Sequence, residues 1–492
     1  MKKNREDKKI IFKVLSLFIV LVSLFLLLFI GFKYGLQNII SETRIDEISN
    51  ILNTKQRISL GGYSVGIYKL FNLVLVLISI KAWFFVKKKV RNKFIRLIIP
   101  LFFISFIIKY LFTLYACAVS CSIYSFVDWL ISFAGGFVRR GLSGYLILFL
   151  SDLLKTKPDT IVLAVQTFFY LGYMVLLFCL IYKKKINFLF LIILLSPATL
   201  RFPILDSAGA GRKEIILFFI FALYLLSLEK KKNYSFFSNL LFSLLIVFAT
   251  FFHELIFFYT PYFMLIAYLK SKVENQVYSF WQHSLFILLP LLAMILIFLF
   301  GRDINGPIIG ADLVRRGLSS EVHNGILDPY WNTYWIKENL HFLKTNNYYI
   351  TYSICTFLGL IPFYFFVKYL KYQISNLKIF STLLLLFVFS SPLFLLACDW
   401  GRWLNIHFML MLFSTTIFLK DKDEITESEH QVTEQFTPHL FQTSRVHKLS
   451  YKTIFSVIFF CYLTMWYMPV ISYESLYESI FINANISIFF NK

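Results

Sequence analysis

Long apolar runs recur from one end of the chain to the other and limit what it can fold into. Runs of about 17 to 25 residues are long enough to cross, as helices, a hydrocarbon core roughly 30 Å thick. Of the 492 residues, 58% are hydrophobic and only 15% are charged, which excludes a soluble domain of this size. The sequence therefore predicts an all-α polytopic membrane protein.

We expect a single integral membrane domain over residues 1–492, with about thirteen transmembrane helices, the range being 11 to 14. The predicted spans are 11–32, 67–86, 97–118, 160–182, 186–200, 214–228, 236–253, 255–270, 283–300, 350–368, 379–398, 403–419 and 453–471.

Lysine clusters at the ends of apolar runs predict which loops face the cytoplasm. These clusters include Lys87–Lys89, Lys183–Lys185, Lys230–Lys232, and Lys368, Lys371 and Lys378. The same pattern explains the net charge of +22 without nucleic acid as a partner. The apolar stretch 11–32 follows a basic N-terminus and lacks a small-x-small cleavage site, so we expect an uncleaved first helix with the N-terminus inside.

Three connecting segments are long enough to have structure or mobility of their own. Residues 119–159 include an apolar stretch too short to span the membrane, which predicts interfacial or re-entrant helices at the outer face. Residues 301–349 form a large outer loop with another expected interfacial helix. Residues 420–452 are polar and are expected to form a mobile cytoplasmic loop.

Charged residues other than lysine gather at the predicted outer face. Asp399 and Arg402 lie in an Asp-Trp-Gly-Arg-Trp turn between two apolar runs, and charges are costly wherever they touch lipid. Such a pair indicates either an ion pair that fixes helices or part of a ligand site. Further charges at the same face are Asp128, Arg139, Arg140, Asp206, Arg212, Lys213, His253, Glu254, Arg315 and Arg316.

One hexapeptide, Val-Arg-Arg-Gly-Leu-Ser, occurs at residues 138–143 and again at 314–319. Both copies are predicted outside, where the positive-inside trend disfavours arginine pairs. An anionic ligand is one explanation, because the arginine fork binds phosphate oxygens with paired hydrogen bonds. Two similar helix caps without a shared ligand are the other.

Candidates for proton transfer are His253, Glu254 and Asp128. A histidine titrates near neutrality, and a carboxyl in a poorly solvated site can have its pKa raised toward neutrality. The alternative is that these side chains only form hydrogen bonds between helices. The sequence has neither a nucleotide-binding motif nor the ligand spacing of a zinc site, so we expect no cofactor and assign no residue as a metal ligand.

The motifs Phe-Val-Arg-Arg-Gly-Leu, Phe-His-Glu and Asp-Trp-Gly-Arg-Trp, on a helical bundle of this length, resemble the repeat-unit polymerases of capsule and O-antigen synthesis. The layout is also similar to C-type glycosyltransferases, whose outer loop carries an acidic base, here matched by Asp128. The long third outer loop favours the polymerases.

This resemblance implies an enzyme of the bacterial cytoplasmic (inner) membrane that polymerises undecaprenyl-diphosphate-linked repeat units. Its partners would be the polyprenyl-diphosphate-linked glycan, membrane lipids, a flippase and a chain-length regulator. Glu254, His253 or Asp128 would act as the base, and Asp206 and Asp399 would orient arginines. The expected diphosphate ligands are Arg139, Arg140, Arg212, Lys213, Arg315, Arg316 and Arg402. A C-type transferase using a polyprenyl-phosphate donor, a flippase for the same glycan and a membrane scaffold remain alternatives.

Overall fold

The computed structural model describes residues 124–230, 236–274, 276–301, 306–318, 333–370, 376–419 and 445–471, with short pieces between residues 77 and 111. The chain divides into two compact units, residues 1–79 and 80–492, and every contact discussed below lies within the second. The predicted helix 11–32, most of 67–86, half of 97–118 and most of the loop 420–452 lie outside the described residues.

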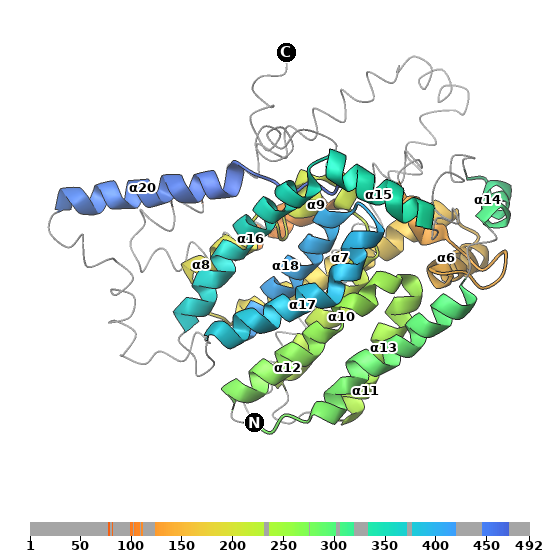
Figure 1. The fold of residues 1–492 in the computed structure, drawn as a ribbon, viewed down its shortest axis with the longest axis horizontal. Helices are drawn as coiled ribbons and strands as arrows, with labels where there is room; N and C mark the ends of the chain where they lie inside the picture. The colour runs from red at the N-terminus through yellow and green to blue at the C-terminus, as the bar shows by residue number, and fades with distance from the viewer. Residues whose placement is uncertain are drawn as a thin grey trace, which may run out of the picture. The chain divides into compact units, whose positions relative to one another are not determined.

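Every regular element in the described ranges is helical (Figure 1). The elements are α5 (Tyr124–Val127), η1 (Asp128–Leu130), α6 (Gly141–Leu154), α7 (Pro158–Tyr182), α8 (Phe188–Leu195), α9 (Phe202–Leu205), η2 (Ser207–Gly209), α10 (Glu214–Lys230), α11 (Phe236–Phe252), η3 (Glu254–Tyr259), α12 (Pro261–Val273), α13 (Phe280–Phe300), α14 (Gly306–Arg315), α15 (Thr333–Thr345), α16 (Tyr348–Leu370), α17 (Asn376–Leu396), α18 (Trp400–Ile417) and α20 (Arg445–Thr464).

Three of the described helices are long and apolar enough to cross a membrane: α7, α13 and residues Tyr348–Val367 of α16. Shorter apolar helices include α6, α11 and parts of α17 and α20. Helices also occur in the predicted outer segments, as α6 and α15. The all-helical prediction is therefore confirmed for the described ranges.

Two predicted spans differ from the structure in length or regularity. The helix within 186–200 is α8, whose 8 residues extend only about 12 Å at 1.5 Å per residue, too short for the hydrocarbon core. The run 255–270 begins as the 3-10 helix η3 and becomes an α-helix only at Pro261. The expected loop 420–452 also overlaps the start of α20 at Arg445.

Helix α18 lies at the centre of the described bundle. Every residue from Gly401 to Phe413 is buried, including the polar side chains of Arg402, Asn405 and His407. α10 packs against both α18 and α7, while α11 packs along α13 (Figure 1). This arrangement brings the beginnings of α10 and α18 together. α10 begins at the charged residue Glu214, and α18 directly follows Asp399.

Candidate functional site

The first hexapeptide copy forms the turn that leads into α6. Arg140 has φ 62°, in the left-handed region, and is the residue before the first helical position, Gly141. Ser143 Oγ donates to the Arg140 carbonyl oxygen at 3.1 Å. This local geometry directs the Arg140 side chain away from its own helix and toward residues that are remote in sequence.

Arg140 binds two carboxylates. Its Nη2 donates to Glu254 Oε1 at 2.6 Å, and its Nε lies 2.9 Å from both Glu254 oxygens. Its Nη1 donates to Asp128 Oδ1 at 3.3 Å. Arg139 approaches the same Glu254 carboxylate, with Nη1 at 3.8 Å from Oε1. One arginine pair thus joins η1 and η3 to the start of α6.

Arg402 is the second centre of charge. It donates through Nη1 to Asp399 Oδ2 at 2.6 Å, which confirms the ion pair expected from the Asp-Trp-Gly-Arg-Trp turn. Its Nε forms an ion pair with Glu214 Oε1 at the start of α10. Its Nη2 lies 3.2 Å from His253 Nε2. Arg402 therefore links α18 to α10 and to the segment that follows α11.

His253 connects the two arginine centres. Arginine can only donate, so the contact with Arg402 requires His253 Nε2 to be the acceptor. His253 Nδ1 lies 3.5 Å from Glu254 Oε2 and 3.4 Å from the backbone nitrogen of Leu255. We call the connected residues the charge cluster: Asp128, Arg139, Arg140, Lys213, Glu214, His253, Glu254, Asp399 and Arg402.

Most of the charge cluster is buried, and this shifts its titration. Burial alone would raise the pKa of Asp128, but Lys213 and Arg140 outweigh burial and hold that pKa well below its usual range. Burial would also raise the pKa of Glu254, but the positive charge of Arg140 outweighs burial and lowers that pKa. The expectation of a raised pKa at Glu254 is therefore wrong, because the sequence could not reveal the arginine bound to it.

Lys213 and His253 shift in the direction that burial dictates. Burial lowers the pKa of His253 to about 4, and Arg140 adds to the effect. Burial likewise lowers the pKa of Lys213 to about 8, against the attraction of Asp128. Lys213 Nζ lies 3.7 Å from Asp128 Oδ2. At neutral pH, His253 is thus neutral, and Asp128 and Glu254 are firmly ionised.

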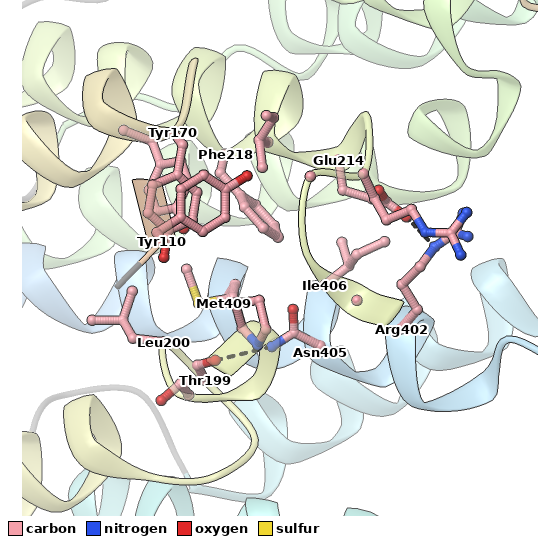
Figure 2. Close-up of a pocket in the computed structure, with 16 residues that line it drawn as sticks. Tyr110, Tyr170, Thr199, Leu200, Glu214, Phe218, Arg402, Asn405, Ile406 and Met409 are labelled. Atoms are coloured by element: carbon pink, nitrogen blue, oxygen red, sulfur yellow. Dashed lines mark hydrogen bonds and ion pairs between the residues drawn. The ribbon is translucent and has the colours of Figure 1, made fainter. Parts of the chain in front are cut away.

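A small cavity, lined by residues of α7, α10 and α18, lies beside the charge cluster. Glu214 and Arg402 lie at one end, and Tyr110, Tyr170 and Phe218 lie at the other (Figure 2). Asn405 lines the cavity and donates to the carbonyl oxygens of Ala198 and Thr199 at 2.8 and 3.2 Å. One end of the cavity is therefore charged and the other aromatic.

Two other predicted site residues bind backbone groups. Arg212 lines the cavity, and its Nε donates to the Ala208 carbonyl oxygen at 3.0 Å. Asp206 accepts from the backbone nitrogens of Ala208 at 3.0 Å and Val470 at 2.7 Å. These contacts show Asp206 orienting backbone segments, where the prediction had it orienting an arginine.

The second hexapeptide copy lies elsewhere. Arg315 binds Asp312 at 2.5 Å, and its side chain is 79% exposed. Arg316 binds Asp312 and, at 2.5 Å, Asp152 near the end of α6. Twelve helical residues separate Asp152 from Arg140, or about 18 Å at 1.5 Å per residue. The two arginine pairs therefore lie at opposite ends of α6 and bind different carboxylates.

The two copies also differ in local structure. The first begins a helix, whereas the second ends one, with Gly317 at φ 84° after the last turn of α14. A left-handed glycine at that position is a common helix terminator. The repeated letters therefore do not indicate two equivalent caps.

Glu214 is the member of the charge cluster that sequence reasoning missed. It follows Lys213 at the start of α10, where an acidic residue is favoured by the helix dipole alone. The only available signal was that this acid begins an apolar run beside other charges. Its partner Arg402 lies on α18, far away along the chain.

Among the described residues, no group of three or more His, Cys, Asp or Glu side chains is arranged to hold a metal ion. No protein-family model, curated protein or solved structure matches the chain. The site must therefore be interpreted from its own geometry.

Proposed function

We propose that the protein catalyses glycosyl transfer at the outer face of the bacterial cytoplasmic membrane, polymerising undecaprenyl-diphosphate-linked repeat units. In this proposal the chain crosses the membrane about thirteen times, as its apolar runs predict. The observation that carries the proposal is the charge cluster, in which arginines from two distant parts of the chain meet at buried carboxylates.

The arginines support recognition of a diphosphate. The side chains of Arg139 and Arg140 are 16% exposed, so they are buried enough to be oriented and still reach the surface. Fixed guanidinium groups stabilise the negative charge that develops on a departing diphosphate without having to reorganise. Arg212 adds a further positive charge beside the cluster.

The carboxylates that hold these arginines take a positioning role in the proposal. Glu254 and Asp128 have lowered pKa values, and both are ion-paired to Arg140. A strongly acidic carboxyl group is a weak base, since proton transfer is most efficient when the pKa lies near the working pH. Their task would be to aim Arg140 at the donor.

Deleting the gene and analysing the surface glycan and the lipid-linked intermediates tests the function. Single repeat units on lipid at the outer face, with no polymer, are the expected result. Accumulation of complete units inside the cell would indicate a flippase, and an incomplete unit would indicate a C-type glycosyltransferase. Unchanged polymer would overturn the proposal.

Point variants test the site itself. Arg139→Ala and Glu254→Ala should each abolish chain extension, the first by removing a donor contact and the second by releasing Arg140. The amount of each variant in the membrane should match wild type. Normal polymer length in both variants would contradict the assignment of the charge cluster.

A further inference from the structure

The first turn of α18, which carries Arg402, lacks a side-chain cap. The first N–H groups of an α-helix have no partner within the helix, and the side chain of the residue before it often accepts from one of them. Asp399 holds that position, but its side chain makes no cap hydrogen bond and binds Arg402 instead. The Gly401 N–H donates to the carbonyl oxygen of Val470 at 3.4 Å. A segment that is remote in sequence therefore takes the place of the cap.

This segment consists of Pro469 and Val470, which follow α20 and which we call the latch. Asp206 Oδ2 accepts from the Val470 nitrogen at 2.7 Å. Tyr352, on α16, shares its hydroxyl proton between the carbonyl oxygens of Pro469 and Val470, at 3.1 and 3.2 Å. Both Tyr352 and Val470 are buried. The latch is thus fixed by side chains from two other parts of the chain, α16 and the residue after α9.

The latch approaches α18 more closely than a side chain at the contact would allow. A Cβ on Gly401 would overlap the carbonyl group of Pro469 and would also meet the Cα of Val470. Glycine is the residue that permits such a close approach of two backbones. Because Gly401 directly precedes Arg402, the latch determines where the first turn of α18 lies, and Arg402 with it.

Arg402 depends on this placement because two of its partners come from other elements. Its guanidinium binds Glu214 at the start of α10 (Figure 2), and its Nη2 lies 3.2 Å from His253 Nε2. A shift of about 0.5 Å in the first turn of α18 would lengthen the second contact beyond hydrogen-bonding range. His253 in turn lies beside Glu254, which binds Arg140. The position of the latch therefore bears on both arginine centres.

Resting on the function proposed above, we propose that Asp206 and Tyr352 are positioning residues that hold Arg402 in the charge cluster through the latch. Neither side chain is hydrogen-bonded or ion-paired to a member of the cluster among the described residues. The sequence predicts that Asp206 orients an arginine directly, whereas the proposed route runs through the backbone of Val470 and Gly401.

Two substitutions of Asp206, each carried by cells as the sole copy, test the latch. Asp206→Ala removes both acceptor oxygens, whereas Asp206→Asn keeps one acceptor oxygen for the Val470 N–H. Polymer should fall at least tenfold in Asp206→Ala, because small misplacements of a binding group are costly. It should stay within threefold of wild type in Asp206→Asn. Wild-type polymer in Asp206→Ala overturns the proposal, and so does an equal loss in the two variants.

Tyr352→Phe, with Tyr462→Phe as its matched control, covers the case in which Asp206→Ala does not accumulate. Each variant loses one hydroxyl that bonds a backbone carbonyl, and Tyr462 on α20 donates to Leu358 on α16 at 3.1 Å. The two variants should melt within a few degrees of each other. Only Tyr352→Phe should lower polymer, at least threefold. An equal polymer loss in both would show that attachment of α20 matters rather than the latch, and would overturn the proposal.

Binding of undecaprenyl diphosphate to the purified full-length chain separates the role of the latch from the proposed function. Tyr352→Phe should bind this probe at least threefold more weakly than wild type, and Tyr462→Phe should bind it as wild type does. If wild type fails to bind and the deletion strain makes normal polymer, the proposed function itself fails. If wild type binds and Tyr352→Phe binds and polymerises equally well, only the positioning role fails.

Discussion

The guanidinium of Arg140 holds the carboxylate of Glu254 across 114 residues of chain, with Nη2 at 2.6 Å from Oε1. The sequence predicts separate roles for the two residues, with Arg140 binding the donor phosphate and Glu254 transferring a proton. The contact makes them a single unit in which each determines the charge and position of the other.

Arg140→Ala should lower the free energy of unfolding by about 3–5 kcal/mol, because it leaves Glu254 as a buried charge without its main partner. Arg315→Ala, the matched change in the second hexapeptide copy, should cost less than about 1 kcal/mol, since that side chain is 79% exposed. Thermal unfolding of the detergent-purified variants measures both. An equal loss of unfolding free energy in the two variants would contradict the prediction that Arg140 is buried in an ion pair and Arg315 is exposed.

Gly401→Ala should destabilise the start of α18. A Cβ at this position would overlap the carbonyl oxygen of Pro469, and forcing such an overlap costs about 1–3 kcal/mol. Gly401 also donates to the Val470 carbonyl oxygen at 3.4 Å, so the 469–470 segment should shift. Limited proteolysis of α20 and the following residues should reveal the displacement.

A matched glycine change controls for backbone effects. Gly317 has φ 84° and nothing within 4 Å of its Cβ position, so Gly317→Ala tests conformational strain alone, about 1–2 kcal/mol. Only Gly401→Ala should increase cleavage after α18. Increased cleavage in both variants would point to general destabilisation.

Acid should weaken the fold through His253. Burial lowers the pKa of this imidazole to about 4, against roughly 6.5 in the unfolded chain. Between these values the unfolded chain binds more protons, so stability is lost as the pH falls from 6.5 to 4. The loss from this group is up to about 3 kcal/mol. Melting temperatures measured across that pH range should decline less steeply in His253→Gln, and an unchanged slope would refute the assignment.

Trp129→Phe should disturb the turn that precedes α10. The indole Nε1 donates to the Gly211 carbonyl oxygen at 2.7 Å, and Gln166 Nε2 donates to the same oxygen at 2.8 Å. Because Gln166 remains, the loss should be only about 1 kcal/mol. Polymer yield should nevertheless fall several-fold, since this turn leads directly into Lys213 and Glu214. Quantitative gel analysis of the glycan checks the yield, and wild-type yield would show that the turn does not need Trp129.

Local and long-range features differed in how well they could be predicted. The helices α7, α13 and α16 follow from uninterrupted apolar runs, because backbone groups in an apolar environment must be paired within the segment. The Asp399–Arg402 pair follows from spacing, since residues three apart meet on one helix face. The interruption at η3 was signalled by Pro261, because proline favours the first position of a helix, but the run containing it was predicted as one continuous span.

The sequence by itself determined that the protein is helical. It also determined which charged residues lie at the ends of apolar runs and must be kept away from lipid. Only the tertiary structure decided which charges meet. It joined Arg140 to Glu254 and Arg402 to Glu214, and separated Arg316 from both by placing it beside Asp152. The physical reason is that periodicity and propensity act over a few residues, whereas an ion pair between helices depends on how whole elements pack. The same packing decided that Glu214, absent from the predicted site, lines the cavity.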